Sequence, residues 1–575
     1  QAVLAPRLAL AHRRCSAIAY ILHQSSRVMA NGIVETVKDQ ERVLVIDFGS
    51  QVSHLICRRV REAGVYCELR SCLLKPEEVT AFQPKGVILS GGPHSVYDAD
   101  APHLGQAVWE LLEEQRLPIL GICYGLQEMC HSHGGKVESG IKREFGNAQL
   151  TIRTDLAAPG ASDGKKARGS SPLFQGINAD EAVKVWMSHG DKVTQLPDTF
   201  VQIAHTSSCE YAAVESHARR MWGVQFHPEV THTPCGGQLI KNFVVNICGC
   251  KGSWNMHDFA MKQVNAILGK LGDGYVVGAV SGGVDSSVAA ALVHRAIGKR
   301  FRPFMVDTGL LRKDEAPIVK KRLEEHIPGM ELMVIDASKT FYSALAGVTE
   351  PEQKRKIIGR LFIEAFEQAV KEMGLPVEQC LLLQGTLYPD VIESTSYRGP
   401  STIIKTHHNV GGLPERMKMG ILEPLRLLFK DEVRALGREL GLAEESVMRH
   451  PFPGPGLGIR IIGEVSQENA NTLRAADDIY IEEIRRTGHY DKIGQAFAVL
   501  LPTVRSVGVM GDHRTYENVC VLRAVTTSDF MTADWYDMPH DVLGRISNRI
   551  INEVKGINRV CYDVSSKPPA TIEWE

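Results

Sequence analysis

The chain has 575 residues, of which 44% are hydrophobic and 23% are charged, and its formal net charge is −2. This length exceeds what one hydrophobic core can organise and predicts roughly three or four domains. A nearly neutral chain has no electrostatic reason to coat nucleic acid or an anionic membrane, so we expect neither as a partner. No apolar run in the sequence reaches the length of a membrane span.

The first residues differ in composition from the rest of the chain. Residues 1–34 contain no Asp or Glu, are rich in Ala, Leu and Ser, and carry four arginines. This composition is typical of an organelle transit peptide, and non-native upstream sequence with Met29 as the true start explains it equally well. We therefore set residues 1–40 apart as a leader and expect a cytoplasmic protein, with organelle targeting as the alternative.

The thirteen cysteines are scattered and form no C-x-x-C pair. Cys67 with Cys72, or Cys248 with Cys250, have spacings that a metal site can use, but no matching second pair lies nearby. We interpret these side chains as the reduced thiols of a cytosolic protein.

From residue 42 onward, short apolar segments alternate with helix-like segments. Strands are predicted at residues 42–49, 86–93 and 117–125, and a further strand at 221–229 closes the series. Strands that alternate with helices in this way predict a parallel sheet covered by helices. We assign residues 41–250 to this first domain.

The alternation restarts with an apolar strand at residues 274–280, which is followed by a helix. It continues through residues 301–309 and 381–390 and ends at the Pro/Gly cluster His450–Gly458. A second parallel-sheet domain is therefore predicted over residues 251–454.

The remaining residues, 455–575, combine a few strands with amphipathic helices at 471–488 and 540–556. Strands separated by single helices at this size are typical of a small α+β module. The predicted fold class is thus α/β, with two doubly wound parallel-sheet domains followed by a small α+β domain.

The strongest local signal in the first domain is GICYG, residues 121–125, which places Cys123 between a predicted strand and a helix. The glycines allow a turn that is too tight for side chains, and the start of the helix favours a thiolate. A lone cysteine in such a place is more often a buried structural residue. The segments that follow two other strands make a catalytic role the better interpretation for Cys123.

His227 and Glu229 follow a predicted strand, and a His–carboxylate pair is what a thiol nucleophile needs for proton transfer. The glycines of SGGP, residues 90–93, end another strand, where backbone N–H groups could hold an oxyanion. Together these segments resemble the class I glutamine amidotransferases over about residues 43–247. By that resemblance Cys123 attacks the side-chain amide of glutamine, His227 transfers the proton and Glu229 orients His227.

The same resemblance implies further residues around the substrate. They are Gly92 and Tyr124 as backbone donors to the oxyanion, and Gln127, His189 and Asp191 as residues that line the glutamine pocket.

A second site is predicted at SGGVDSS, residues 281–287, between a strand and a helix. Adjacent glycines let the backbone approach an oxyanion, and the helix start favours it, while Asp285 could reach a phosphate only through a metal such as Mg²⁺. A bare SGG would indicate only a capped turn, and a Walker A loop is excluded because no Gly-Lys in the chain precedes Ser or Thr. The whole segment resembles the phosphate loop of the N-type ATP pyrophosphatases, which implies adenylyl transfer with release of pyrophosphate.

By this resemblance Asp285 also holds the Mg²⁺. The implied ATP-binding residues are Ser281, Gly282, Gly283, Val284, Asp285, Ser286, Ser287 and Lys405. Lys354–Lys356 could also reach phosphates, but for these residues alone we favour the ordinary interpretation of a solvated basic face. The adjacent His407 and His408 point apart on any regular element and do not predict a metal site.

The order of all motifs resembles the GMP synthase (glutamine-hydrolysing) family, in its compact form with one dimerisation module. The resemblance covers essentially everything after residue 42 and includes RHPFPGPGLGIR at Arg449–Arg460 and KPPATIEWE at Lys567–Glu575. It implies that ATP adenylates xanthosine monophosphate (XMP), that ammonia from glutamine displaces AMP to give GMP, and that the protein is a homodimer. The implied XMP-binding residues, in a dimerisation and XMP-binding domain at 455–575, are Gln495, Arg514, Lys567, Ile572 and Glu573.

Two other interpretations remain at this stage. One is a different enzyme on the pyrophosphatase scaffold that acts on an NAD precursor or on tRNA, and the near-neutral charge and the C-terminal motif weigh against it. The other is an idle relative that senses nucleotides or binds proteins. Intact Cys123, His227 and Glu229 argue against the second, because a binding module needs no activated thiol.

Overall fold

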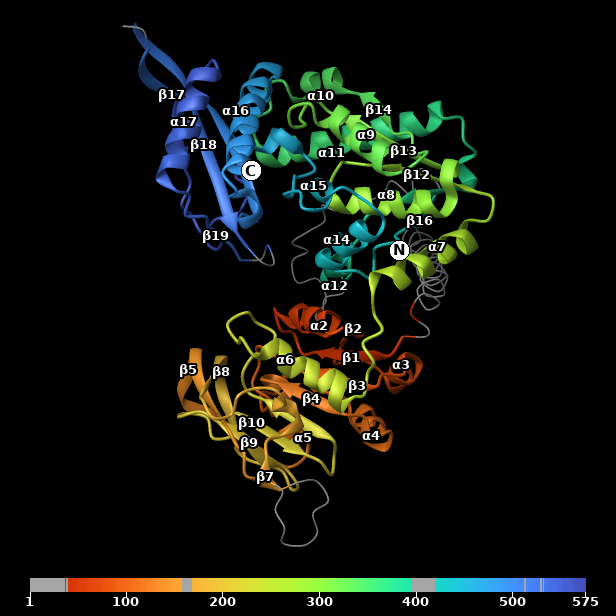
Figure 1. Cartoon of the computed structure of the whole chain (residues 1–575), viewed down its shortest axis with the longest axis vertical. Coiled ribbons are helices and arrows are strands. Elements are labelled where there is room, and N and C mark those ends of the chain that lie inside the picture. Colours follow the sequence, from red (N-terminus) through yellow and green to blue (C-terminus); the bar gives the residue numbers. More distant parts are fainter. Residues whose placement is uncertain are drawn as a thin grey trace, which may run out of the picture. The chain divides into compact units, whose positions relative to one another are not determined.

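The computed structural model describes residues 40–157, 168–394, 419–510, 513–527 and 532–575, together with Val37 and Phe530. The chain divides into two compact units, Gln1–Phe259 with Pro389–Ile403, and Ala260–Tyr388 with Ile404–Glu575 (Figure 1). Within the described residues no helix is both long enough and apolar enough to cross a membrane.

The first unit is built on a nine-stranded sheet with the order β2-β1-β3-β4-β11-β10-β9-β5-β8. Its strands are β1 (Arg42–Asp47), β2 (Tyr66–Ser71), β3 (Gly86–Leu89), β4 (Ile119–Ile122), β5 (Lys136–Ile152), β8 (Val183–Gln195), β9 (Val201–His205), β10 (Ala213–Ser216) and β11 (Met221–Val224). The strands from β2 to β11 in this order are parallel, and the others pair antiparallel. Strands β3 and β4 are buried throughout, which explains their continuous apolar sequence.

Helices pack on this sheet through apolar positions that recur at helical spacing. In α2, Ile56, Cys57 and Val60 are buried, so they lie on one face of the helix. The described helices of this unit include α2 (Ser53–Glu62), α3 (Pro76–Phe82), α4 (Gln106–Glu114), α5 (Tyr124–Ser132) and α6 (Gly236–Lys241), and a two-stranded sheet joins β6 (Leu156–Ala157) to β7 (Arg168–Gly169). One boundary between the units falls within α12 (Tyr388–Ser394), after Tyr388.

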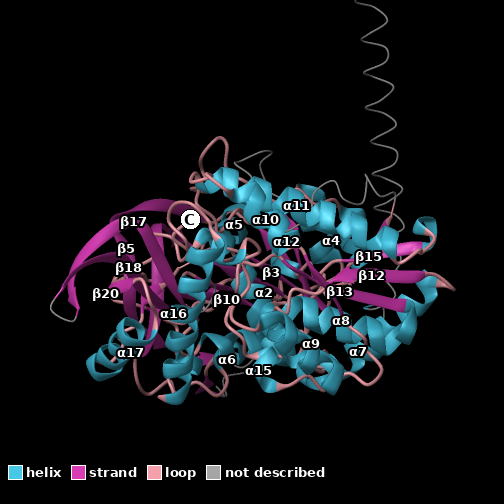
Figure 2. Cartoon of the chain, turned by 90° about the horizontal axis from the view of Figure 1, so that it is seen from above, coloured by secondary structure: helices cyan, strands magenta, loops and turns pink. Residues whose placement is uncertain are grey.

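The second unit contains a five-stranded parallel sheet with the order β14-β13-β12-β15-β16. Its strands are β12 (Tyr275–Ala279), β13 (Phe301–Asp307), β14 (Met333–Asp336), β15 (Cys380–Leu383) and β16 (Gly420–Leu422). Helix α8 (Val284–Ile297) lies on one face of this sheet and α11 (Pro351–Glu372) on the other (Figure 2). The other described helices around it are α7 (Met256–Leu271), α9 (Glu315–His326), α10 (Ser338–Leu345), α14 (Lys430–Glu439) and α15 (Glu444–Val447).

The last part of the second unit is a four-stranded sheet covered by α16 (Gln467–Arg486) and α17 (His540–Glu553). It is dominated by the long hairpin of β17 (Gln495–Met510) and β18 (His513–Thr526), with β19 (Asp534–Trp535) and β20 (Ile557–Tyr562) beside β18. One cluster of buried side chains runs from Val277 of β12 to Leu522 of β18, so both sheets of this unit share a core. The predicted α/β class with parallel sheets is confirmed.

Candidate active sites

The predicted nucleophile Cys123 lies on the turn between β4 and α5, where it caps the N-terminus of α5. Its φ of 51° and ψ of −105° are values that a residue with a side chain adopts only under strain. A β-carbon on Gly125 would lie 2.4 Å from the carbonyl oxygen of Leu89, so the turn has no room for a side chain there. This is the sharp strand-to-helix turn that the flanking glycines predict.

His227 and Glu229 form the expected pair, because Nδ1 of His227 lies 2.7 Å from Oε1 of Glu229. The backbone N–H of His227 donates to the carbonyl oxygen of Trp186 at 3.0 Å, which fixes the chain at this point. A β-carbon built on Gly91 would lie 3.3 Å from Cε1 of His227 and 3.8 Å from Cβ of Cys123. The histidine and the cysteine therefore converge on the loop after β3.

The charge state of His227 follows from its surroundings. Burial alone would lower its pKa, but the Glu229 carboxylate and the Cys123 sulfur raise the pKa of His227 well above its usual value. Nε2 of His227 is buried and has no hydrogen-bond partner among the described residues. The raised pKa favours the protonated ring, and this is the form that stabilises a thiolate and can protonate a leaving amine.

The predicted oxyanion residues lie at the base of the same turn. A β-carbon on Gly92 would lie 2.9 Å from the carbonyl oxygen of Phe48 and 3.1 Å from Cγ of Tyr124. The backbone N–H of Gly125 donates to the carbonyl oxygen of Ser90 at 2.9 Å, which joins the two loops. Gly92 and Tyr124 are therefore neighbours beside Cys123.

The residues predicted for the glutamine pocket also come together. Nε2 of Gln127 donates to the backbone oxygen of Asp191 at 2.9 Å, and Nδ1 of His189 lies 2.9 Å from the same oxygen. Burial lowers the pKa of His189, whose Nε2 lies 3.2 Å from Oε2 of Glu144. A neutral, hydrogen-bonded histidine suits a pocket for an uncharged side chain such as that of glutamine, which carries an amide on an apolar stem.

Four residues of this region escaped the sequence-based prediction. Nε2 of Gln225 lies 3.6 Å from the Cys123 sulfur, and Tyr97 donates from its hydroxyl to Oδ1 of Asp191 at 2.9 Å. Ser95 hydrogen-bonds the same carboxylate. Glu144 is the fourth. The only sequence signal for Ser95 and Tyr97 was their closeness to SGGP, and the only signal for Gln225 was its closeness to His227. Glu144, on β5, is close to neither.

The loop SGGVDSS joins β12 to α8, as predicted. The hydroxyl of Ser286 accepts from the backbone N–H of Ser281 at 3.2 Å and donates to the carbonyl oxygen of Gly283 at 3.1 Å. Gly282 has a φ of 72°, and a β-carbon there would lie 2.5 Å from Cγ2 of Val319. The loop is therefore folded on itself at the start of an α-helix, with a conformation at residue 282 that glycine accommodates.

Lys430, which the sequence did not single out, forms the closest contact of the Asp285 carboxylate. Nζ of Lys430, at the start of α14, lies 2.7 Å from Oδ1 and 2.6 Å from Oδ2 of Asp285. This carboxylate is thus placed to bind a cation, and its oxygens are the ligands that Mg²⁺ prefers. Among the described residues no three His, Cys, Asp or Glu side chains gather to hold a metal. The predicted ATP residue Lys405 lies outside the described residues.

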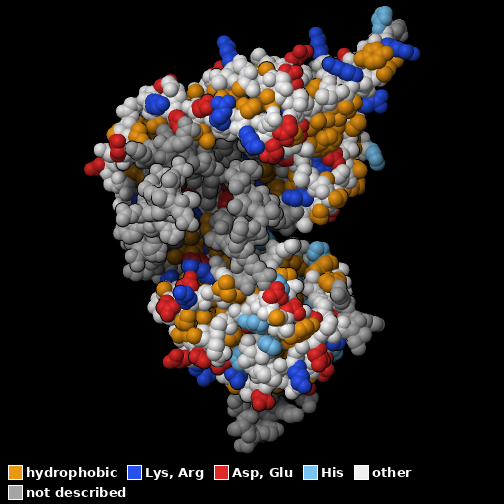
Figure 3. Space-filling model, turned by 180° about the vertical axis from the view of Figure 1, so that it is seen from behind, with side chains coloured by type: hydrophobic (Ala, Val, Ile, Leu, Met, Phe, Trp, Pro, Cys, Tyr) orange, Lys and Arg blue, Asp and Glu red, His pale blue; other side chains and the backbone are white. Residues whose placement is uncertain are grey.

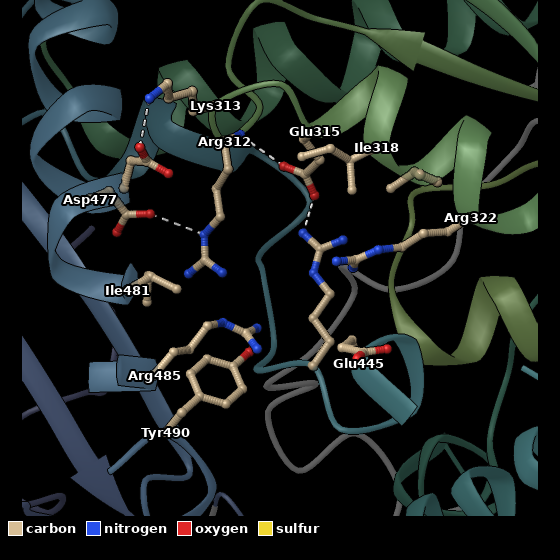
Figure 4. Close-up of a pocket in the computed structure, with 13 residues that line it drawn as sticks. Arg312, Lys313, Glu315, Ile318, Arg322, Glu445, Asp477, Ile481, Arg485 and Tyr490 are labelled. Atoms are coloured by element: carbon tan, nitrogen blue, oxygen red, sulfur yellow. Dashed lines mark hydrogen bonds and ion pairs between the residues drawn. The ribbon is translucent and has the colours of Figure 1, made fainter. Parts of the chain in front are cut away.

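A pocket of about 140 Å³ lies beside this loop (Figure 4). Nη1 of Arg449 donates to the carbonyl oxygen of Gly282 at 2.9 Å, and Arg449 also pairs with Glu315. Figure 4 shows Arg312 beside Asp477, with which it pairs, and Arg485 below it against the ring of Tyr490. These residues were not predicted from the sequence. The pocket is lined by Arg312, Lys313, Glu315, Ile318, Val319, Arg322, Glu445, Arg449, Asp477, Asp478, Ile481, Arg485 and Tyr490.

The structure brings together three of the five predicted XMP residues. Nε2 of Gln495 donates to Oε1 of Glu573 at 2.6 Å, and the carbonyl oxygen of the adjacent Ile572 accepts from Nε of Arg523 at 2.8 Å. Lys567 lies on the same C-terminal segment, and its Nζ donates to the carbonyl oxygen of Phe530 at 2.7 Å. The base of β17 and the C-terminal segment therefore form one polar site.

Arg514 is not part of this cluster. Gln495 pairs with Val525 at one end of the β17–β18 hairpin, whereas Arg514 pairs with Val509 near its other end. Arg514 and Val525 are 11 positions apart on β18, which spans roughly 35 Å at about 3.3 Å per residue. Within one subunit, Arg514 cannot contact a ligand that is bound at Gln495.

The interpretation of Lys354–Lys356 as a solvated basic face is wrong for Lys354. Its side chain is 0% exposed, and its Nζ lies 2.6 Å from Oε2 of Glu575. Lys356, two residues further along α11, is exposed as expected. This ion pair could not be predicted, because its partners are 221 residues apart in the sequence.

Comparisons with known proteins identify the family of two parts of the chain. Residues 44–247 match the family described as Glutamine amidotransferase class-I, and residues 482–574 match the GMP synthase C terminal domain. The fold and the Cys123 site thus define a class I glutamine amidotransferase domain in the first unit.

Whole-length relatives narrow this class further. The GMP synthase [glutamine-hydrolyzing] of Rhizobium etli is 55% identical over 537 residues, which cover 93% of this chain and 99% of that protein. The protein of the same name from Brucella suis is 54% identical over 544 residues, which cover 94% of this chain and all of that protein, 100%. The chain therefore belongs to the GMP synthase (glutamine-hydrolysing) family.

Proposed function

We propose that this chain makes GMP from XMP, with ATP as the activating co-substrate and glutamine as the nitrogen donor. The observation that carries the proposal is the presence, in one chain of this family, of the Cys123–His227–Glu229 constellation and of the Ser281–Ser287 phosphate loop. The first supplies ammonia, and the second activates the nucleotide that receives it.

At the first site the Cys123 thiolate attacks the amide carbon of glutamine. The proton on His227 passes to the leaving ammonia, and water then hydrolyses the glutamyl thioester to glutamate. The raised pKa of His227 supports this sequence of steps, because it favours the protonated ring that the first step requires. The backbone N–H groups of Gly92 and Tyr124 stabilise the oxyanion, and Gln127, His189 and Asp191 bind the glutamine side.

At the second site the O2 of XMP attacks the α-phosphate of ATP, and pyrophosphate leaves. Backbone N–H groups and hydroxyls of Ser281–Ser287 hold the β- and γ-phosphates at the start of α8, and Lys405 adds a cation. Ammonia then displaces AMP from C2 of the adenylated XMP to give GMP. A bound Mg²⁺ would neutralise phosphate charge, with Asp285 as its protein ligand in place of the present contact with Lys430.

XMP binding is assigned to the cluster at the base of β17. The amide of Gln495 and the carboxylate of Glu573 offer donors and acceptors to a purine or a ribose, and the backbone beside Ile572 borders them. Lys567 is the cation on the same segment for the nucleotide phosphate.

A homodimer gives Arg514 a role that one subunit cannot. The outer part of the β17–β18 hairpin exposes apolar side chains, namely Val504, Val507, Val509 and Tyr516 (Figure 3). Exposed apolar surface of this kind suits a protein interface. We place Arg514 of the partner subunit at the XMP phosphate, and the hairpin as the segment that delivers it.

The same proposal includes a cytoplasmic location and domain boundaries at residues 41–250, 251–454 and 455–575. Residues 1–40 remain apart as a leader, and apart from Val37 and Gln40 they lie outside the described residues. The sheet of the first unit supports the first boundary, because its strands run from Arg42 to Val224.

The direct test of the substrate is pyrophosphate release on mixing the protein with ATP and a candidate acceptor. XMP is expected to give pyrophosphate and AMP in the presence of ammonia, while a deamidated NAD precursor and tRNA give neither. Release with one of those acceptors and not with XMP would replace the proposed function with the corresponding alternative.

A further inference from the structure

The C-terminal segment, residues 563–575, is held by three cations whose side chains are 0% exposed. They are Lys354, Arg460 and Arg523, and they come from α11, from the turn before α16 and from β18. Fully buried cations are rare and occur with close partners, because an unpaired charge in the interior is costly. Their convergence on one short segment indicates that its position is specified.

Arg523 fixes the path of the main chain. Its Nε donates to the carbonyl oxygen of Ile572 at 2.8 Å, and its Nη2 donates to that of Thr571 at 2.9 Å. Its Nη1 lies 2.8 Å from Oδ2 of Asp563, at the start of the segment. The guanidinium group thus ties both ends of the segment to β18.

Arg460 fixes the functional side chain. Its Nη2 and Nε donate to the two carboxylate oxygens of Glu573, at 2.8 Å and 3.1 Å. The same carboxylate accepts from Gln495, so Arg460 orients the group that the proposed function assigns to XMP. The main chain of Arg460 is itself fixed, because its carbonyl oxygen accepts from the backbone N–H of Leu500 on β17 at 2.8 Å.

Lys354 connects this arrangement to α11. Its Nζ donates to Oε2 of Glu575 at 2.6 Å and to the carbonyl oxygen of Ile461, the residue after Arg460, at 2.7 Å. The adjacent Arg355 hydrogen-bonds the main-chain oxygen of Glu575. The buried ammonium group of Lys354 therefore contacts both the end of the C-terminal segment and the turn before α16, which carries Arg460.

We propose that Lys354 is a positioning residue for nucleotide binding, which acts through Glu575 and Arg460 to hold Glu573 against Gln495. The inference rests on the proposed function, since it concerns the same XMP site. Lys354 has no direct contact with Gln495 or Glu573. Lys354 therefore affects XMP binding by keeping the C-terminal segment ordered, and it does not contact the nucleotide itself.

The test compares XMP binding by the full chain with binding by Lys354→Met, by Glu575→Gln and by the double variant. Methionine retains the apolar stem of the lysine, so packing around α11 is preserved. Lys371→Met is the matched control, because Lys371 is an exposed lysine of the same helix. Calorimetry gives the Kd for XMP, and ammonia-driven synthesis gives KM for XMP and for ATP.

Both single variants are expected to raise the Kd and the KM for XMP about ten-fold, with the KM for ATP and the basal glutaminase activity unchanged. The double variant is expected to resemble the singles, because both substitutions break the same contact. Lys371→Met should match the parent protein. If Lys354→Met does not fold, Glu575→Gln alone decides, since it keeps the lysine in place.

An unchanged Kd for XMP in a folded Glu575→Gln variant would overturn the inference. Equal losses toward ATP and XMP would overturn it as well, because they would indicate a general loss of structure. Failure of the proposed function looks different. In that case the parent protein itself neither binds XMP nor releases pyrophosphate with it.

Discussion

Replacing Cys123 by Ala is expected to abolish glutamine-dependent GMP formation and to leave ammonia-dependent formation intact. The substitution removes the nucleophile at the turn between β4 and α5 while Ser281–Ser287 is untouched. Loss of a catalytic nucleophile commonly costs a factor of roughly 10⁴ or more. The measurement is GMP formation from ATP and XMP, first with glutamine and then with an ammonium salt at mildly alkaline pH.

Cys130→Ala is the matched control for this variant. Cys130 lies on the same helix, α5, and burial raises its pKa to about 12, so its thiol is inert. Glutamine use should survive in this control apart from a modest loss of stability. If ammonia fails to support GMP formation by Cys123→Ala, the two sites are not chemically separate and the assignment of Cys123 to ammonia production alone is wrong.

Gly282→Ala is expected to have the opposite effect, with pyrophosphate release reduced by roughly 100-fold or more and basal glutaminase activity retained. A β-carbon at residue 282 would lie 2.5 Å from Cγ2 of Val319, and the φ of 72° disfavours any side chain. The loop must therefore move away from the position at which its N–H groups meet the phosphates. Pyrophosphate release from ATP and XMP, with ammonia present, measures the loss.

The control for strain without collision is Gly298→Ala. Gly298 ends the same helix, α8, and its φ of 54° is also positive, but a β-carbon there meets nothing within 4 Å. This variant should lose roughly 1–3 kcal/mol of stability and keep its pyrophosphate release. Similar losses of release in both variants would show that the effect comes from helix stability, and would contradict a role for the loop geometry.

The local parts of both sites were predictable because short-range rules determine them. Glycines beside Cys123 and at residues 282–283 mark turns at strand ends, and the carboxyl ends of parallel strands meet at one edge of a sheet. His227 and Glu229 are two residues apart and follow a strand. Their pairing needed no knowledge of the tertiary structure.

Contacts between distant parts of the chain could not be predicted in this way. Lys430 reaches Asp285 across 145 residues, and Arg449 reaches Gly282 across 167. A lysine at the start of a helix is usually solvated, so the basic run at residues 354–356 favoured a solvated face, which is wrong for Lys354. The burial of Lys354 and the long-range contacts of Lys430 and Arg449 follow from the packing of several elements, which a single sequence does not encode locally.

In the fold, too, features set by local sequence were predictable and features set by long-range packing were not. Apolar runs such as residues 86–89 and 119–122 predicted parallel strands, which are buried on both faces. The antiparallel extension by β5, β8 and β9 was not predicted, because strands with one exposed face have mixed sequences. In β8, for example, buried and exposed positions alternate. Polar residues at its exposed positions obscure the strand in the sequence. β10 is buried at all four positions, but its buried Glu215 and Ser216 break the apolar run.

The measurement that tests the central claim most directly is the release of glutamate and GMP in one reaction, with and without ATP and XMP. Free ammonia in neutral water is mostly ammonium, which is not a nucleophile, so the two sites should work together. We predict slow glutamine hydrolysis by the protein alone, and with both nucleotides a much faster reaction that yields one GMP for each glutamate. Glutamine hydrolysis at the same rate in both conditions, or glutamate without GMP, would contradict the account.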